Sequence, residues 1–482
     1  MLHKLGDPPA SSKSLGLKDV GRQRRAESDL LPLPLSLSRY PPPFDYHKGG
    51  MHRFSLVQLV FSAASIIATL STLVNSTPLS LEATSSQFPV RNAPGLPSNG
   101  LQSSGIHLGF LPNWEQENPQ LINKALGDSI SIIGDYLNVS PRDYSFNQVD
   151  YHLESVVKIA TGKVKAVYSP AVLFSDSLDQ WTDQMTKNLV EKMKEVNRRG
   201  VTVWLRFLFE MNGGWMPYGL RPDLYVPLFR DVAEQVRAAT NNTYMLYAPN
   251  VWNGPVDDQQ QGYQIYFPGE DYVDLVGLSF YSLGSDKSAN QAADPSLFRD
   301  SFTPFYNLFS PTSSSSSSNL LKLSAAYPIV IAETSAPYYY KIPPGSRYFL
   351  QGGDTDIPAS NMPNLSTYTP SQTSPPSPHT DDELYLKATW LVQLTSNSTA
   401  SRFPNLKAVS WFNYLKKGSS EKQVLADFRF VGGNSTVEQW VRQNFGNQTA
   451  YEEGYTGGGR RIGANGVIAT IVGIFGMLLL LL

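Results

Sequence analysis

The chain has 482 residues, a formal net charge of −2 and no cysteine. This length accommodates one large domain or two to three small ones. The near-neutral charge argues against a nucleic-acid partner, and without cysteine neither disulfides nor thiolate metal sites can form. The six histidines show none of the spacings typical of zinc sites, so we expect no metal ion and no cofactor. Aromatic residues make up 12 % of the chain, which suits a sugar-binding cleft and equally an ordinary large core.

The N-terminal region resembles targeting sequence rather than a folded domain. Residues 1–50 are rich in Pro, Ser and Arg without periodicity, and we expect them to be disordered or to precede the true start codon. Residues 51–77 begin "MHRFSLVQLVF", a basic start followed by an apolar run, and later by small polar residues. That order predicts a signal peptide, and a single membrane anchor is the alternative. We expect residues 78–104 to form a linker.

The C-terminal region carries a second signal. Residues 451–466 form a Gly-rich spacer, with a candidate lipid-attachment site around 454–459, and residues 467–482 are a run of 16 apolar residues. This order predicts a glycosylphosphatidylinositol (GPI) anchor. The alternative is a short transmembrane tail, although 16 residues fall short of the roughly 20 that a membrane span needs. Either way, the chain is expected at the outer face of the cell surface.

Six N-glycosylation sequons lie between these two ends and agree with passage through the secretory pathway. They are at Asn138, Asn241, Asn364, Asn397, Asn434 and Asn447.

Short apolar segments rich in β-branched and aromatic residues recur through residues 105–450. The predicted strands are 105–111, 129–137, 163–171, 201–210, 243–250, 273–281, 327–334 and 406–414, and helical periodicity is clear at 177–200, 221–240 and 381–396. Eight nearly continuous apolar strands separated by crossovers predict a parallel sheet buried on both faces. We therefore expect an α/β fold, a (β/α)8 TIM barrel that forms a single catalytic domain. An open doubly wound sheet is the alternative, but its usual glycine-rich phosphate turn is missing after the first strand.

Two low-complexity segments, 311–319 and 351–380, interrupt this pattern. Both are predicted to be flexible insertions in loops. The second follows the end of the seventh predicted strand, which would place it over the catalytic face of a barrel.

Two predicted strands end in a glutamate, Glu210 on the fourth and Glu333 on the seventh. The C-terminal ends of the strands build the active site of a barrel. Strand alternation puts Arg206 on the same face as Glu210, where the arginine would lie beneath the carboxylate. A pair of carboxyl groups is what glycoside hydrolysis requires, one to donate a proton and one to attack the sugar or activate water. The alternative is that each glutamate forms an ordinary salt bridge at the barrel rim.

Four motifs resemble glycoside hydrolase family 26. They are "LRFLFEMNGGWMPYG" (205–219), "YFPGEDYVDLVGLSFYS" (266–282), "PIVIAETSAP" (328–337) and "AVSWFNY" (408–414), and the similarity extends over about 105 to 445. The resemblance implies a barrel hydrolase with catalytic glutamates on strands four and seven.

The resemblance also implies a role for each matching residue. Glu210 would be the acid/base and Glu333 the nucleophile. The remaining substrate-binding residues would be Arg206 supporting the site, Tyr281 bonding the nucleophile, Trp215 and Trp411 stacking on sugar rings, and Asn250 and Trp252 lining the cleft. The alternative for each tryptophan is packing in the core, and for Asn250 a role in a turn.

One departure from the family concerns the sugar. Mannan-cleaving members typically have histidine directly before the acid/base, where this chain has Phe209. The sugar is thus left open between β-mannan and a related β-glycan. From the glutamate pair and the resemblance together, we expect a retaining endo-β-glycosidase, and we expect it to be a monomer. A cell-wall transglycosylase on the same scaffold and a non-catalytic carbohydrate-binding surface protein are the alternatives.

Overall fold

The computed structural model describes residues 88–283, 289–346, 355–356, 362–371, 382–418 and 423–445, all within the compact unit Thr84–Leu482. The predicted disordered region, signal peptide, Gly-rich spacer and apolar tail lie outside these residues, as does most of the 351–380 insertion. Those interpretations stay predictions.

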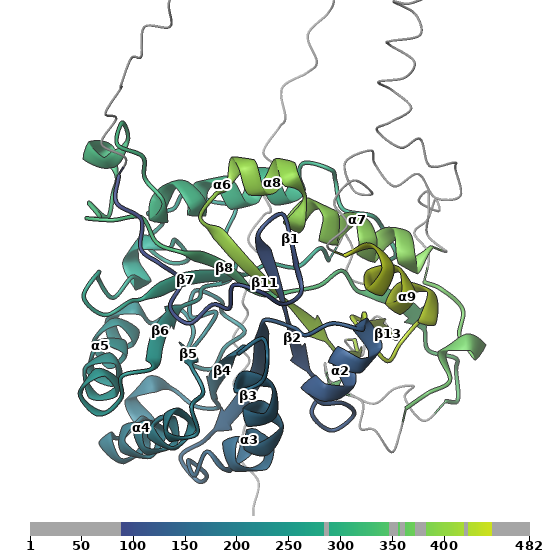
Figure 1. The fold of residues 1–482 in the computed structure, drawn as a ribbon, viewed down its shortest axis with the longest axis horizontal. Coiled ribbons are helices and arrows are strands. Elements are labelled where there is room, and N and C mark those ends of the chain that lie inside the picture. The colour runs from purple at the N-terminus through teal and green to yellow at the C-terminus, as the bar shows by residue number, and fades with distance from the viewer. Residues whose placement is uncertain are drawn as a thin grey trace, which may run out of the picture. The chain divides into compact units, whose positions relative to one another are not determined.

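Eight parallel strands form a closed barrel (Figure 1). They are β2 (Ile106–Pro112), β3 (Ile132–Val139), β4 (Val167–Phe174), β5 (Val203–Phe207), β6 (Thr243–Tyr247), β7 (Leu275–Ser279), β8 (Ile329–Thr334) and β11 (Leu406–Asn413). Each strand pairs with the next along the chain, and β2 closes the barrel by pairing with both β3 and β11. The predicted (β/α)8 barrel is thus confirmed, and each of its strands falls on a predicted segment.

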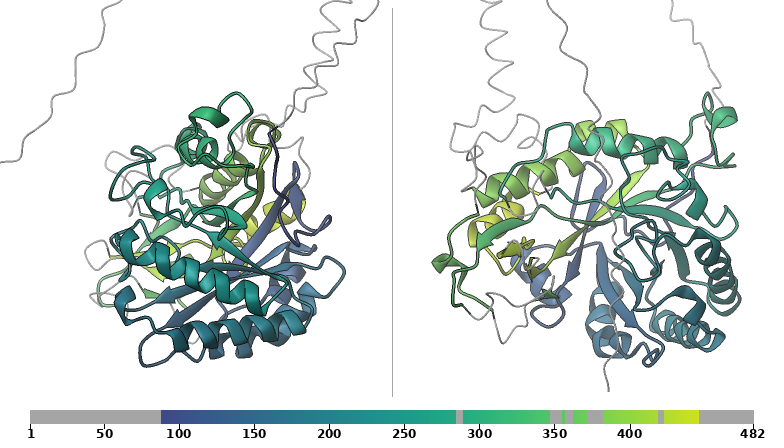
Figure 2. Two further views of the ribbon diagram at one scale, coloured as in Figure 1. Left: turned by 90° about the vertical axis from the view of Figure 1, so that its left-hand side faces the viewer. Right: turned by 180° about the vertical axis from the view of Figure 1, so that it is seen from behind.

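Helices connect most consecutive strands and cover the outside of the sheet (Figure 2). They are α2 (Pro119–Leu126), α3 (Asn147–Ala160), α4 (Asp183–Arg198), α5 (Pro222–Ala239), α6 (Leu297–Phe309), α7 (Glu383–Thr395), α8 (Asn397–Arg402) and α9 (Ser435–Asn444), with the short 3-10 helices η1 (Leu178–Gln180), η2 (Gln264–Tyr266), η3 (Ser316–Ser318) and η5 (Leu365–Thr367). The predicted helices at 177–200, 221–240 and 381–396 correspond to α4, α5 and α7. None of the helices in the described part of the chain is both long and apolar enough to cross a bilayer.

Helix α4 illustrates how local sequence sets these boundaries. Its first turn is capped by the Thr182 hydroxyl, which accepts a hydrogen bond from the backbone N–H of Met185. After its last residue the chain reaches Gly200 in the left-handed conformation, with φ of 79°. Glycine adopts this conformation without steric cost, so the predicted helix stop is well placed.

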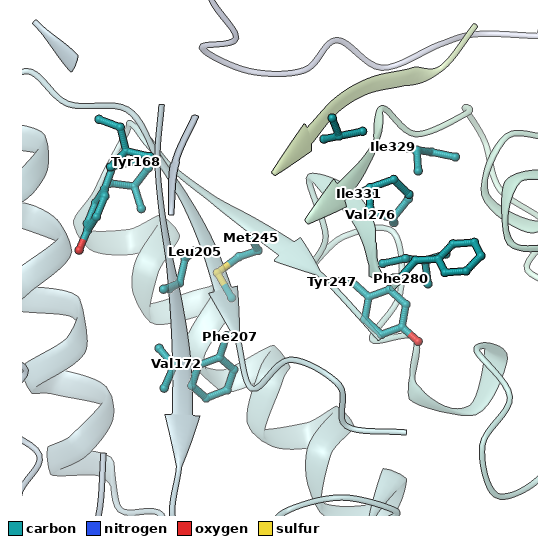
Figure 3. Packing of buried hydrophobic residues seen from close by; sticks show 14 of the residues in the cluster. Tyr168, Val172, Leu205, Phe207, Met245, Tyr247, Val276, Phe280, Ile329 and Ile331 are labelled. Atoms are coloured by element: carbon teal, nitrogen blue, oxygen red, sulfur yellow. The ribbon is translucent and has the colours of Figure 1, made fainter. Parts of the chain in front are cut away.

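Apolar side chains pack in two layers, one on each face of the barrel strands. Leu205, Phe207 and Tyr247 point outward into the layer between strands and helices (Figure 3). Trp204 and Leu246 belong to a second cluster, inside the barrel. Alternation along each strand therefore decides which side chains can reach the barrel axis.

Two smaller elements accompany the barrel. The short strand β1 (Gln102–Ser103) pairs antiparallel with β2. A separate antiparallel sheet has the order β10 (Thr355–Asp356), β12 (Leu415–Lys417), β13 (Val424–Asp427) and β9 (Tyr338–Lys341). Its strands come from the chain segments that follow β8 and β11, so it stands beside the C-terminal ends of those strands.

The prediction of a linker over 78–104 is wrong for its described part, residues 88–104. Arg91 forms an ion pair with Glu270, with 2.6 Å between nitrogen and oxygen. The Pro94 carbonyl accepts a hydrogen bond of 2.7 Å from the indole N–H of Trp204, whose ring lies inside the barrel. Residues 88–104 thus cover the barrel at the N-terminal ends of the strands and form its floor. The apolar side chains inside the barrel give this segment a packing partner that a free linker lacks.

Candidate active site

The C-terminal half of β5 delivers an arginine to the barrel interior. Leu205 and Phe207 point outward into the helix layer, so Trp204 and Arg206 point inward. Arg206 is only 1 % exposed to solvent. A buried guanidinium requires charged or polar partners, and its surroundings supply them.

Glu210 reaches the site through an irregular turn rather than by strand alternation. Strand β5 ends at Phe207, and Leu208 then takes a left-handed conformation with φ of 49° and packs outward. The order of faces is thereby reversed, so Phe209 enters the barrel interior. The prediction that regular strand alternation puts Arg206 and Glu210 on one face is therefore wrong, because the strand ends at Phe207. Glu210 itself has a φ of 54°, and its backbone N–H donates to the Ala248 carbonyl at 2.9 Å, beyond the end of β6.

Glu333 also depends on an irregularity, a bulge in β8. The register toward β7 shifts between the pairs Leu278–Ile331 and Ser279–Glu333. Without this shift, Glu333 would point outward like Ile331. With it, Glu333 points inward and the next residue, Thr334, points outward. A bulge of this kind re-aims side chains at the rim of a barrel.

Two donors hold the Glu333 carboxylate. Arg206 Nη1 lies 2.5 Å from Glu333 Oε2, and the Tyr281 hydroxyl donates to Oε1 at 2.5 Å. The expected partnership of Arg206 with Glu210 is thus replaced by an ion pair with Glu333. Burial and the negative charge of Glu333 raise the pKa of the Tyr281 hydroxyl, which keeps its proton for this bond.

Glu210 lies in a different electrostatic environment. Burial raises the pKa of its carboxyl group, and the negative charge of Glu333 raises it further. Hydrogen bonds from Ser279 and Trp215 and the positive charge of Arg206 act in the opposite direction without cancelling the rise. Trp215 Nε1 donates to Glu210 Oε2 at 2.6 Å. The net rise favours the protonated form of Glu210.

Ser279 joins the two carboxylates and was missed in the sequence. Arg206 Nη2 donates to Ser279 Oγ at 2.5 Å, and the serine in turn hydrogen bonds to Glu210. Its single proton is thus directed at Glu210, while its oxygen accepts from the arginine that holds Glu333. Alternation along the predicted strand 273–281 would put Ser279 on the same face as Tyr281, which is the signal that could have identified it.

The two predicted sugar platforms differ in exposure. Trp215 is 61 % exposed while its indole N–H bonds Glu210, so its ring is accessible beside the carboxyl group. Trp411 is fully buried and stacks on Phe430 with 3.7 Å between ring centroids. The prediction that Trp411 stacks on sugar is wrong, because its position on β11 points it outward. Its neighbour Phe412 points to the site instead, in edge contact with Tyr281 at 5.9 Å.

The residues predicted to line the cleft beyond β6 are held largely through their backbones. Asn250 exchanges two backbone hydrogen bonds with the buried side chain of Asn212, and forms a bridge to Ser279. Trp252 is half-buried, and its indole N–H donates to the Pro255 carbonyl at 3.1 Å. The bridge places Asn250 at the edge of the site, but the contacts of Trp252 lie within its own loop.

Phe209 lies within the barrel, beside the charged centre. The Arg206 guanidinium carbon is 4.1 Å from the centroid of its ring, a cation–π contact. The ring is 4 % exposed and offers no hydrogen-bonding atom to a ligand. The histidine that the resemblance places here is thus replaced by an aromatic ring, which packs against Arg206.

A cavity of about 1690 Å³ lies behind the small sheet. Asp427 and Tyr340 line it, while the next residue along β13, Phe428, contacts Tyr281 on the other side. Its buried charges are paired, Lys387 with Glu383 at 2.5 Å among them. The sheet therefore separates this cavity from the glutamate pair.

Glu117, in the loop after β2, also lines the cavity. Its Oε1 accepts a hydrogen bond of 2.6 Å from Asn413 Nδ2, at the end of β11. Burial raises the pKa of this carboxyl group to about 8, against the opposing effects of Asn413 and Arg429. Glu117 thus ties the first barrel strand's loop to the last barrel strand.

The predicted glycosylation sites differ in accessibility. The exposed ones are Asn138, Asn241 and Asn364, the half-buried ones are Asn397 and Asn434, and Asn447 lies outside the described residues. Asn434 Nδ2 donates to Glu383 Oε2 at 3.0 Å, and its Oδ1 caps α9. The side-chain nitrogen of Asn434, to which a glycan would attach, is thus already bonded to a carboxylate.

Comparison with known proteins agrees with this geometry. The family model for glycosyl hydrolase family 26 matches residues 148–299, which include Arg206, Glu210 and Tyr281 but not Glu333. A mannan endo-1,4-β-mannosidase of Caldalkalibacillus mannanilyticus is 31 % identical over 113 residues, covering 21 % of this chain and 20 % of the relative. Endoglucanase H of Acetivibrio thermocellus is 29 % identical over 106 residues, covering 20 % of this chain and 11 % of the relative. The chain thus spans about a fifth or less of the length of these two relatives.

Several solved structures are also similar to the chain at low sequence identity. A modular endo-β-1,4-mannanase from Cellulomonas fimi has a TM-score of 0.42 and 13 % identity, covering 74 % of this chain and 75 % of that one. GH26A from Muricauda sp. has a TM-score of 0.35 and 16 % identity, covering 50 % and 78 %. Likenesses this distant carry no argument of their own, and the fold rests on the strand pairing described above. Over residues 148–299 the chain is thus similar to glycosyl hydrolase family 26, and the relative from Caldalkalibacillus mannanilyticus is similar to it over 113 residues.

Proposed function

We propose that this protein is a retaining endo-β-glycosidase that hydrolyses β-mannan or a related β-glycan. The observation that carries the proposal is the pair of buried glutamates in unequal environments. Glu333 is ion-paired with Arg206, whereas burial and the charge of Glu333 raise the pKa of Glu210. Such a division between one ionised and one protonated carboxyl group is what glycosidases use at neutral pH.

In the first step, the Glu333 carboxylate attacks the anomeric carbon while Glu210 gives its proton to the departing glycosidic oxygen. A covalent glycosyl–enzyme forms, and the aglycone leaves with the proton. In the second step, Glu210, now ionised, removes a proton from water, and the water oxygen displaces Glu333 from the anomeric carbon. The protonation of Glu210 is restored, and the sugar retains its anomeric configuration.

The surrounding residues serve these steps. Arg206 and Tyr281 each bond one oxygen of Glu333 and so fix its orientation. As the covalent intermediate forms, Glu333 loses its charge, and its effect on the pKa of Glu210 disappears. The pKa of Glu210 then falls, which suits its change from acid to base. Trp215 offers an exposed ring beside Glu210 for the sugar on the leaving side.

The substrate class draws support from the relatives, which are named as mannosidases and an endoglucanase. Because the Phe209 side chain cannot hydrogen bond to a sugar, other residues must distinguish mannan from another β-glycan. We propose β-1,4-mannan as the preferred substrate.

The test is to compare wild type with Glu333→Gln and Glu210→Gln on β-mannan and β-glucan. Each amide keeps the size of the carboxyl group but can neither attack nor donate an acidic proton. We expect kcat to fall on the order of 10³-fold or more on every polysaccharide that wild type shortens. Proton NMR of the first reducing ends should show the β-anomer. Wild-type turnover that survives either substitution, or a first product in the α-form, would contradict the proposal.

We propose further that the protein is GPI-anchored at the outer cell surface. The order of the apolar tail after the Gly-rich spacer, the signal-like segment 51–77 and the sequons support this location. A phospholipase specific for glycosylphosphatidylinositol should release the protein from intact cells. Retention on the cells, with residues 478–482 detected in the mature protein by mass spectrometry, would instead identify a transmembrane tail.

A further inference from the structure

The hydroxyl group of Tyr136, near the end of β3, is buried without a hydrogen-bond partner among the described residues. Its ring lies 5.9 Å from that of Phe209 and 6.3 Å from that of Phe412, measured between centroids. Phe209 and Phe412 have no polar side-chain atom, and a third ring, that of Tyr414, lies 6.2 Å away in edge contact. A buried hydroxyl without a hydrogen-bond partner destabilises the folded state, so a role in binding a ligand would explain its presence here.

The rings beside Tyr136 place it at the charged centre, because Phe209 packs against Arg206 and Phe412 against Tyr281. Burial raises the pKa of Tyr136, and the negative charge of Glu333 raises it further, whereas the positive charge of Arg206 lowers it. The hydroxyl therefore stands beside the ion pair of these two residues. Glu333 also acts on this hydroxyl as a hydrogen-bond acceptor, but the two groups do not meet the geometry of a hydrogen bond. Both oxygens of Glu333 accept closer bonds, from Arg206 and from Tyr281. Tyr136 keeps its proton and can both donate and accept.

A sugar attacked by Glu333 places its anomeric carbon against this carboxylate. The two ring atoms bonded to that carbon are the ring oxygen and C2, and C2 carries a hydroxyl group. We propose that Tyr136 hydrogen bonds the C2 hydroxyl of the sugar attacked by Glu333 and thereby selects between the two C2 epimers. This inference rests on the proposed function, and goes beyond it by naming the residue that reads the sugar.

The chemistry of the substrates makes this contact selective. β-Mannosides and β-glucosides differ only at C2, where the hydroxyl is axial in one and equatorial in the other. The Tyr136 ring is fixed by aromatic neighbours, so its hydroxyl can meet only one of these directions well. A site built to bond a substrate hydroxyl loses that bond completely when the hydroxyl is absent or misplaced.

The test uses three 2,4-dinitrophenyl β-1,4-bioside substrates whose reacting sugar is mannose, glucose or their 2-deoxy form. The 2-deoxy sugar is the same compound for both epimers, so it serves as a common reference. Wild type is compared with Tyr136→Phe, which removes only the hydroxyl. The matched control is Tyr225→Phe, because Tyr225 also has a buried hydroxyl without a partner among the described residues but belongs to α5 and the outer core.

We expect Tyr136→Phe to lower kcat/KM on the order of 10- to 100-fold for the preferred epimer. On the 2-deoxy substrate the same substitution should change kcat/KM by less than about threefold, as should Tyr225→Phe on all three. An equal loss on all three substrates, or no loss on any, would overturn the assignment of Tyr136 to C2. Absence of turnover by wild type on every substrate would instead overturn the proposed function itself.

Discussion

Replacing Glu117 by glutamine should make the protein more stable at alkaline pH. Burial raises the pKa of Glu117 to about 8, well above its ordinary value of 4.5. The folded protein therefore holds a proton on this group that the unfolded chain releases above pH 4.5. Its contribution to stability is complete below pH 4.5 and is lost as the pH rises to about 8. Glutamine has no charge to bury, and its side-chain oxygen can still accept the bond from Asn413.

The size of the effect follows from the two pKa values. From 4.5 to about 8 is 3.5 pH units. At about 1.4 kcal/mol per unit, ionisation of Glu117 costs the folded state up to about 5 kcal/mol. Glu117→Gln should exceed wild type by up to this amount at pH 9 and match it closely at pH 4.5.

Urea unfolding at a series of pH values between 4.5 and 9 measures this difference, because titrating groups common to both proteins cancel. Glu115→Gln is the matched control, since Glu115 is an exposed carboxylate of the same loop. The control should follow wild type at every pH. If the difference between Glu117→Gln and wild type does not grow with pH, the buried carboxyl group does not carry the cost assigned to it.

Three further substitutions test the site. Trp215→Phe removes a hydrogen bond that lowers the pKa of Glu210, so the alkaline limb of the kcat/KM profile should move to higher pH; an unmoved limb would count against Glu210 as the acid. Ser279→Ala removes a second such bond and should move the limb in the same direction, whereas a shift to lower pH would contradict the network. Trp411→Phe should leave KM unchanged and lower the free energy of unfolding by about 1–3 kcal/mol in urea, and a raised KM with unchanged stability would restore its role as a sugar platform.

The strands were predictable because each is an apolar run bounded by turn residues, and parallel barrel strands are apolar on both faces. The residues at which the strands end were harder to predict. The predicted strand 201–210 stops at Phe207, and the predicted strand 273–281 stops at Ser279. In both cases apolar residues continue past the last strand residue, so hydropathy alone gives no signal that the strand has ended.

Alternation fails just before Glu210 and at Glu333 itself. Counted from the inward-pointing Trp204, it would aim Leu208 inward, yet the left-handed turn there sends Leu208 outward. Counted from Ile331, it would aim Glu333 outward, yet the bulge turns it inward. Both departures are backbone irregularities set by pairing with neighbouring strands, and no local residue pattern announces them.

Trp411 shows the opposite error. Alternation from Ala408, which points into the barrel, correctly places Val409 and Trp411 outward. The family resemblance suggested a sugar platform and outweighed that pattern. On a regular strand such as β11, the period of two was the better guide.

The packed N-terminal segment 88–104 has a consequence for the order in which the molecule is built. Pro94 binds Trp204, 110 residues later, and Arg91 binds Glu270, 179 residues later. At roughly 5–20 residues per second of translation, these partners emerge from the ribosome about 5 to 40 s after the segment itself. During that interval the segment has nothing to pack against. The floor of the barrel is thus completed only after residue 270 has been made, by residues that are among the earliest of the described chain.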